Sequence, residues 1–141
     1  MMKSFYLIIV MVWVFFSCTR EENLSTLSGT WKLTAYQQIE TGAIDTEPSN
    51  LERSIEIQFS DNGSTGTISG HTVTNQISGK YALQAGNQIN VESFGGTKVA
   101  EPAWGNRFWT AIYQAGIYQV NSTKLVITNK LHTEKMIFQR K

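Results

Sequence analysis

Cysteine, histidine and proline are scarce in this sequence, and these shortages exclude several kinds of site. The 141 residues include one cysteine, two histidines and two prolines. A single cysteine has no partner in the chain, so we expect no internal disulfide and a fold stabilised by packing alone. No cysteine accompanies His71 and His132, and the two do not form a His-x-x-x-His spacing. The sequence therefore predicts no zinc site. We expect no metal and no cofactor.

The sequence also lacks an excess of charge of either sign. It contains 12 lysine and arginine residues against 11 aspartate and glutamate residues, and the basic residues form no cluster. Binding to the phosphate backbone of a nucleic acid requires concentrated positive charge. We therefore exclude nucleic acid as a partner.

Local signatures of catalysis are missing as well. The segment GGTK at residues 95–98 lacks the full spacing of a phosphate-binding loop, and no serine lies in a nucleophile elbow. A function has to be argued from a site, and the sequence displays none. We therefore expect a protein that is not an enzyme.

No hydrophobic run is long enough to span a membrane. The longest, FYLIIVMVWVFF at residues 5–16, spans about 18 Å as a helix, whereas the hydrocarbon core of a bilayer is about 30 Å thick. Lys3 precedes this run and Ser17 follows it. A basic start, a short apolar run and a small residue are typical of a secretory signal peptide, which we place at residues 1–17.

Cys18 follows the predicted signal peptide directly. It has no disulfide partner, and at the edge of a targeting segment it lacks the surrounding fold that a nucleophile needs. The segment VFFSC resembles the lipobox of bacterial lipoproteins, in which a signal peptidase cuts before the cysteine and acyl chains are attached to it. A plain secretory signal with an incidental cysteine is the alternative.

A polar stretch at residues 18–28 has no periodicity, and we interpret it as a lipidated cysteine followed by a tether. Thr19 is not the aspartate that retains some lipoproteins at the inner membrane. The segment REE at residues 20–22 resembles the export tag of surface lipoproteins, although an ordinary solvated linker explains it equally well. The resemblance implies a protein of the bacterial cell envelope, anchored in the outer membrane by acyl chains on Cys18, at its periplasmic face or on the cell surface.

The rest of the chain mostly alternates between apolar and polar residues, as half-buried strands do. In the segment WKLTAY every second residue is apolar, which places Tyr36 on the opposite face from Trp31. Tight-turn signals such as Asn62-Gly63 separate the segments. We expect a mainly β fold, an antiparallel barrel-like or sandwich arrangement. The eight expected strands lie at residues 31–36, 55–59, 66–73, 79–83, 88–92, 117–120, 124–128 and 135–140.

The stretch EPAWGNRFWTAIYQAG breaks this alternation and has the periodicity of a helix. Its apolar residues recur on one helical face, and these are Trp104, Phe108, Ala111, Ile112 and Ala115. Pro102 suits the first helical turn, and Gly116 suits the position just past the end. We expect an α-helix at residues 102–114 whose aromatic face packs against the sheet. An aromatic box that binds a ligand is the alternative.

Several segments together resemble the META domain, the heat-shock HslJ-like family. TNQISGKY resembles its C-N-x-F-x-G-x-Y motif at Asn75, Gly79 and Tyr81, TKVAE resembles its T-x-M-A-C segment, and LSGTWKL and MIFQR resemble its first and last strands. The resemblance implies a compact β-barrel-like domain, which we place at residues 29–141. It implies no established enzymatic activity, and a loose association with stress and with the cell envelope.

Both cysteines of the family pattern are absent from this chain. Thr74 stands at one of these positions and Glu101 at the other. Joint loss is expected if the two cysteines are partners, because a single loss would leave a free thiol in an oxidising compartment. The resemblance therefore implies that Thr74 and Glu101 are neighbours in space, with Glu101 turned toward water.

The segment GTWK also resembles the Gly-x-Trp start of lipocalins, in which an arginine of the last strand covers the tryptophan. Arg140 shares strand parity with Met136 and Phe138, and Trp31 lies in the first expected strand. If these two strands pair, the Arg140 guanidinium can stack on the Trp31 indole as a structural closing pair. An ordinary core tryptophan is the alternative.

Two functions remain open from the sequence. The first is a lipid-anchored structural or interaction module of the cell envelope, whose partner is an envelope protein or a glycan. The second is a lipocalin-like binder of a small apolar ligand, or an inhibitor of a secreted enzyme. A binder needs an apolar cavity of at least about 300 Å³, whereas the number of aromatic residues favours a filled interior.

Overall fold

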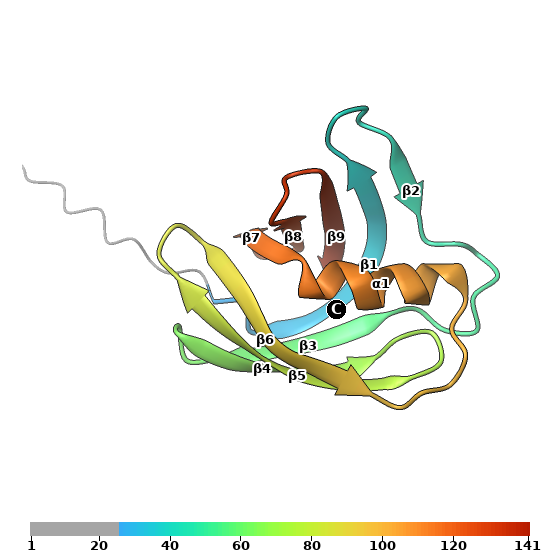
Figure 1. The fold of residues 1–141 in the computed structure, drawn as a ribbon, viewed down its shortest axis with the longest axis horizontal. Coiled ribbons are helices and arrows are strands. Elements are labelled where there is room, and N and C mark those ends of the chain that lie inside the picture. The colour runs from blue at the N-terminus through green and yellow to red at the C-terminus, as the bar shows by residue number, and fades with distance from the viewer. Residues whose placement is uncertain (1–25) are drawn as a thin grey trace, which may run out of the picture.

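A computed structural model describes residues 26–141, which form nine strands and one helix (Figure 1). The predicted signal peptide, Cys18 and most of the tether lie outside the described residues. The elements in chain order are β1 (Gly29–Gln38), β2 (Ile44–Thr46), β3 (Glu56–Asp61), β4 (Thr65–His71), β5 (Gln76–Gln84), β6 (Gln88–Gly96), α1 (Ala103–Tyr113), β7 (Ala115–Val120), β8 (Lys124–Asn129) and β9 (Glu134–Arg140).

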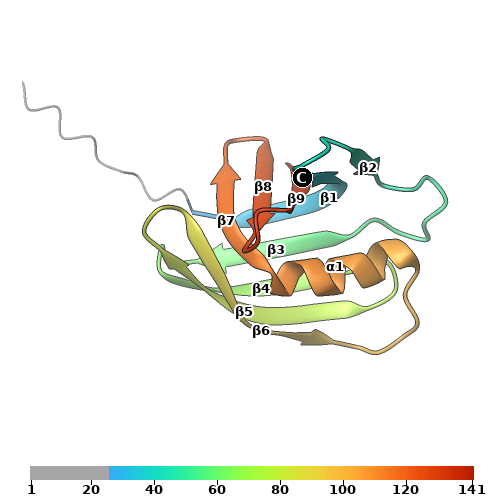
Figure 2. The ribbon, with the colours of Figure 1, turned by 45° about the horizontal axis from the view of Figure 1, so that its top comes forward.

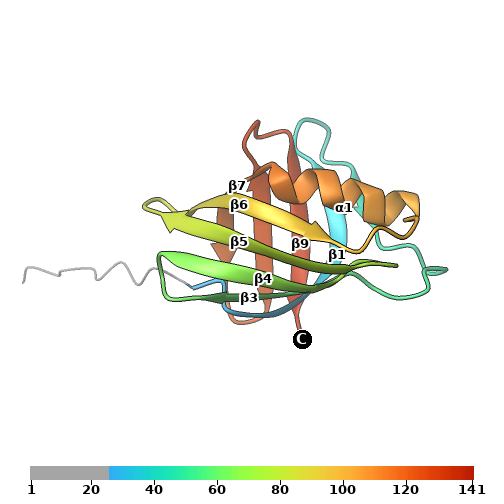
Figure 3. The ribbon, with the colours of Figure 1, turned by 60° about the horizontal axis from the view of Figure 1, so that its bottom comes forward.

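The strands form one antiparallel sheet that closes on itself like a ring. Each strand from β3 to β8 pairs with the next one, and β1 pairs with β3 on one edge and with β9 on the other. In Figure 3, β3–β6 run across the view, whereas β7, β9 and β1 run nearly at right angles to them. The mainly β, antiparallel fold predicted from the alternation is confirmed.

The ring is weakest between β6 and β7. These strands share a single residue pair, Gln88 with Ile117, whereas β5 and β6 pair along nearly their whole length. Helix α1 lies across this side of the sheet, between β6 and the strands β9 and β1 (Figure 2). The helix therefore covers the place where backbone pairing is poorest.

Large side chains fill the space inside the ring. The largest fully buried aromatic side chains are Trp31, Tyr36, Phe59, Tyr81, Phe108, Tyr118 and Phe138. Aromatic residues bury more apolar area than any others, so this interior supplies most of the hydrophobic stabilisation.

Strand β1 departs from the simple alternation. The pairing of β1 with β9 shifts between Leu33 and Ala35, which marks a β-bulge. A bulge adds one residue to one strand and so changes which side chains face the core. Tyr36 is therefore fully buried on the same side as Trp31, and its expected place on the opposite face is wrong.

Helix α1 confirms the predicted element to within a residue at each end. Trp104, Phe108 and Ile112 are buried, as their spacing predicts. Three details were wrong. Ala115, expected on the helical face, is the first residue of β7. Pro102 is the extended residue before the helix rather than part of its first turn. Gly116 lies in β7, where a Cβ would come within 3.0 Å of the Lys130 backbone, so close strand approach explains this glycine.

Two features of the fold carry no clear signal in the sequence. Strand β2 is only three residues long and each of its residues is exposed, so no apolar alternation marks it. The described residues form nine strands rather than eight. The folded unit also extends before Gly29. Leu27 is fully buried, and its backbone N–H donates to the Asp61 carboxylate over 3.1 Å.

Candidate functional site

The predicted closing pair lies where the first and last strands meet. Trp31 and Arg140 are paired residues of β1 and β9, and the Arg140 guanidinium carbon lies 4.1 Å from the centroid of the Trp31 ring. Arg140 Nε also donates to the Ser122 carbonyl over 2.8 Å. The guanidinium therefore covers the indole at the seam of the ring, where the first and last strands pair.

Asn75 is the centre of a hydrogen-bond cluster beside the loop that leads into α1. It is 1% exposed. Its amide nitrogen donates to Thr74 Oγ1, to the Val99 carbonyl and to Glu101 Oε1 over 3.1, 2.8 and 2.8 Å. Its amide oxygen accepts from Thr97 Oγ1 and from the Val99 N–H over 2.9 and 2.6 Å. Asn75 therefore ties the start of β5 to the loop that leads into α1.

Glu101 belongs to the same cluster. Its Oε1 accepts hydrogen bonds from Thr72, Asn75 and Trp109. Its Oε2 is buried without a partner in the described part of the chain, and it lies so close to Gly105 that a side chain there would collide with it. The expectation that Glu101 faces water is therefore wrong, and the glycine within the helix has a steric reason.

The electrostatics of Glu101 follow from these contacts. Burial acts to raise the pKa of Glu101, but the hydrogen bonds from Thr72, Asn75 and Trp109 lower it more. The pKa therefore lies below the usual value for a glutamate, and the carboxylate is ionised at neutral pH.

The two positions that carry cysteine in the family pattern lie side by side. The Thr74 hydroxyl donates to the carbonyl of Ala100, the residue before Glu101, over 3.0 Å. Asn75, which follows Thr74, contacts the Glu101 carboxylate directly. In this chain a network of hydrogen bonds therefore joins the two segments that the family pattern would join by cysteines.

An open cleft borders this cluster, which we call the β6 cleft. It has a volume of about 380 Å³ and lies between the end of β6, the loop before α1 and the outer face of α1. Trp109 and Tyr113, one helical turn apart, line one wall, and Phe94 lies beneath them. Residues 95–98, the GGTK segment, form the facing wall.

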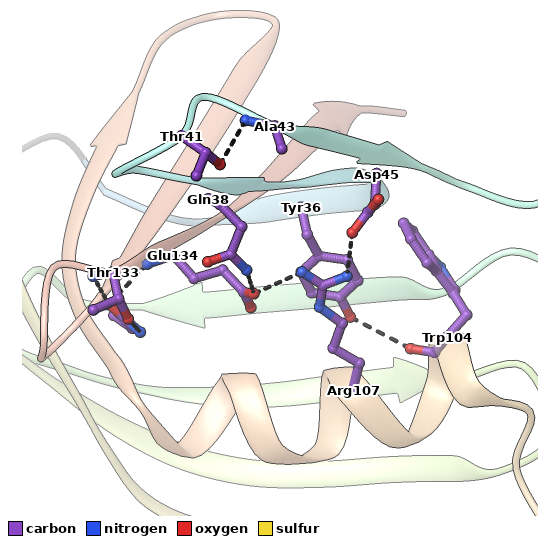
Figure 4. Close-up of polar contacts among 10 residues, drawn as sticks. Tyr36, Gln38, Thr41, Ala43, Asp45, Trp104, Arg107, Thr133 and Glu134 are labelled. Atoms are coloured by element: carbon purple, nitrogen blue, oxygen red, sulfur yellow. Dashed lines mark hydrogen bonds and ion pairs between the residues drawn. The ribbon is translucent and has the colours of Figure 1, made fainter.

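A second cleft, which we call the β9 cleft, lies on the opposite side of α1. It has a volume of about 310 Å³, and Gln38, Arg107 and Glu134 are among its lining residues. Arg107 forms ion pairs with Asp45 over 2.8 Å and with Glu134 over 2.7 Å (Figure 4). Its guanidinium carbon also lies 4.1 Å from the centroid of the Tyr36 ring. One side chain of α1 thus contacts β1, β2 and β9.

The charged groups of the β9 cleft satisfy one another. Partial burial acts to lower the pKa of Arg107, but hydrogen bonds with Glu134 and Asp45 outweigh it and raise that pKa. Burial raises the pKa of Tyr36 far above its usual value, and its hydroxyl donates to the Trp104 carbonyl over 3.4 Å. Tyr36 therefore stays neutral at physiological pH, and the cluster is suited to holding the helix on the sheet.

Neither cleft contains an evident metal site. Within residues 26–141 no three histidine, cysteine, aspartate or glutamate side chains come together in a way that could hold a metal ion. In the same part of the chain, no helix is long and apolar enough to cross a membrane.

A comparison with protein families decides the assignment of the chain. The family model of the META domain matches residues 23–141. This chain belongs to the META domain family. The match covers the whole described domain, including the segments around Asn75 and Glu101.

Two solved structures share the fold of this META domain. The NMR structure of a protein from Burkholderia xenovorans is 22% identical, with a TM-score of 0.63, and the alignment covers 81% of this chain and 82% of that one. The crystal structure of a DUF4847 family protein from Bacteroides vulgatus ATCC 8482 is 18% identical, with a TM-score of 0.60 and coverage of 81% and 93%. A comparison with curated proteins finds no match. The comparisons therefore indicate a small β domain.

The META motif residues have structural roles in this chain. Asn75 holds the loop before α1, as described above. Gly79 lies where a Cβ would come within 2.5 Å of the Ser93 carbonyl of the neighbouring strand. The Tyr81 hydroxyl donates to Asp61 over 2.7 Å, and Asp61 holds the start of the folded unit. The sequence motif therefore marks positions that build the domain. No motif includes Arg107, Trp109 or Tyr113, so the sequence did not predict them as cleft residues.

Proposed function

We propose that this META-domain protein is a lipid-anchored, non-catalytic interaction module of the bacterial cell envelope. Acyl chains on Cys18 hold it in the outer membrane, and the folded domain contacts an envelope protein or glycan. VFFSC supports the anchor, because the META match begins shortly after it, at residue 23. Two or more acyl chains would make the attachment firm.

The filled interior is the observation that carries the interaction role. Seven large aromatic side chains occupy the inside of the ring and are fully buried, and this supports an interaction module over a lipocalin-like binder of a small apolar ligand. The β6 cleft and the β9 cleft both lie on the surface beside α1. A partner would therefore bind to the outside of the domain.

The chemistry of the clefts supports a role without catalysis. Asp45 and Glu134 are paired with Arg107, Glu101 accepts three hydrogen bonds, and Tyr36 is kept neutral by burial. General acid–base catalysis needs a group that is free to exchange a proton near neutral pH. These side chains are instead committed to internal contacts.

Metabolic labelling with a clickable fatty acid tests the anchor. We expect the wild-type protein to be labelled and to sediment with outer membranes, and the matched control Thr19→Ala to behave in the same way. Cys18→Ala should incorporate no label and should remain uncleaved or become soluble. Undiminished labelling of Cys18→Ala would show that the anchor is assigned to the wrong residue.

A further inference from the structure

The β6 cleft combines two ring faces with unused polar groups, and this combination has a specific chemistry. Tyr113 is 44% exposed, yet its hydroxyl donates to the Phe94 carbonyl. Trp109 is partly exposed, and its indole N–H donates to Glu101 Oε1. The polar groups of both rings are bound to the protein, so the rings are held in place while part of each ring remains exposed in the cleft.

The aromatic contacts below make this wall rigid. The Phe94 ring forms T-shaped contacts with Trp109, with centroids 5.1 Å apart, and with Tyr113, with centroids 5.9 Å apart. Phe94 is itself packed against Phe108 of the core. A platform that is already ordered loses little conformational entropy when it binds a ligand.

Polar groups surround this platform and remain free for a ligand. Within residues 26–141, the Lys98 ammonium forms no ion pair and the Asn106 amide oxygen accepts no hydrogen bond, although both line the cleft. The Tyr113 oxygen can also accept a further hydrogen bond. Donors and acceptors therefore stand beside the aromatic faces.

The charges of the cleft disfavour a cationic ligand. Glu101 is the acidic residue among its lining residues, but Oε1 already accepts three hydrogen bonds and Oε2 is buried against Gly105. The accessible charge is the ammonium of Lys98. Aromatic faces alone would attract a cation, but this ammonium would repel it.

We propose that the β6 cleft binds a pyranose unit of a glycan. The C–H face of a pyranose ring is apolar and weakly positive, so it packs on the electron-rich faces of aromatic rings. Its hydroxyl groups need donors and acceptors around the edge of the ring, which Lys98 and Asn106 provide. A cleft of about 380 Å³ also falls in the size range of small-ligand sites.

The position of the cleft fits such a role. All three ribbon views place the loop before α1 at the end of the molecule opposite the start of the described chain (Figures 1–3). The loop that lines the β6 cleft therefore lies opposite the end of the domain where the described chain begins. The inference deepens the proposed interaction role by naming the class of partner, and it rests on that role for its biological setting.

Binding measurements on the full-length lipidated protein in detergent micelles test the site. The probes are cellohexaose, chitohexaose, dextran, mannan and polygalacturonate. Binding of each probe is measured by saturation-transfer NMR and by tryptophan fluorescence. We expect at least one probe to bind saturably, with a dissociation constant of about 1 mM or lower. Tyr113→Ala and Trp109→Ala should each weaken that binding about tenfold or more.

A matched control separates loss of the site from loss of the fold. Leu131 is 74% exposed and lies in the turn before β9, so Leu131→Ala should leave binding unchanged. Tyr113→Ala removes an exposed ring and should retain the thermal unfolding transition of the wild type. Saturable binding by none of the five probes, or equal binding by wild type and both ring variants, would overturn the proposal. Because fatty acid labelling reports on the anchor separately, an acylated protein that binds no probe would refute the glycan site alone.

Discussion

Replacing Asn75 by alanine removes the side chain that ties β5 to the loop before α1. The amide makes five hydrogen bonds, with Thr74, Thr97, Glu101 and twice with Val99. A net hydrogen bond is worth about 1 kcal/mol, and a buried partner left unsatisfied costs about 1–3 kcal/mol. Water can reach part of this network through the β6 cleft, so we expect a loss of about 3 kcal/mol in the free energy of unfolding. That is a large share of the stability of a small domain.

Urea unfolding followed by circular dichroism measures this loss. The urea midpoint should fall while the dependence of the free energy on urea stays constant, as it does when only stability changes. Asn121→Ala is a matched control, because the Asn121 side chain accepts hydrogen bonds from Thr123 and Lys124 in an exposed turn and its loss should cost about 1 kcal/mol. Equal costs for the two asparagine variants would refute the reasoning that burial makes Asn75 a structural centre.

Three further changes test other parts of the structure. Phe108→Ala should lower the free energy of unfolding by about 3–5 kcal/mol, because it leaves a cavity under α1, and a cost below about 1 kcal/mol in urea unfolding would place this face outside the core. Burial acts to raise the pKa of Asp61, but hydrogen bonds from Tyr81, Thr26 and the backbone lower it more. The ionised Asp61 carboxylate therefore stabilises the fold above about pH 4, and this stabilisation is lost as the pH falls through the lowered pKa. Asp61→Asn should thus make the free energy of unfolding less dependent on pH in the acid range. An unchanged pH dependence would contradict this role of Asp61. Thr74→Cys with Glu101→Cys should form a disulfide on periplasmic expression, and reducing it should cost about 3–4 kcal/mol; thiol titration that finds two free cysteines would count against the pairing.

The order of the elements could be predicted because each long strand and the helix carry their own periodicity. Trp104, Phe108 and Ile112 lie four residues apart and face the core together, as one side of a helix must. Strand β2 could not be predicted, because its three residues are exposed and only their pairing with β1 defines them. Tyr36 was misplaced because a bulge depends on the register of two strands that are distant in the sequence.

The two clefts could not be predicted from the sequence either, because their lining residues come together only in the folded domain. Arg107 meets Asp45 and Glu134 only after α1 packs on the sheet, and nothing local to any of the three residues indicates the others. Glu101 was expected to face water because a glutamate usually does. Its carboxylate is instead turned inward, toward donors from Thr72, Asn75 and Trp109 that only the fold brings together.

The mass of the mature N-terminal peptide tests the proposed lipid anchor most directly. The peptide would be isolated from outer membranes of the native cell and analysed by mass spectrometry. We expect the mature chain to begin at Cys18 and to carry at least two acyl chains on that residue. A chain that begins at another residue, or an unmodified Cys18 thiol, would contradict the assignment of this META-domain protein as a lipid-anchored module of the cell envelope.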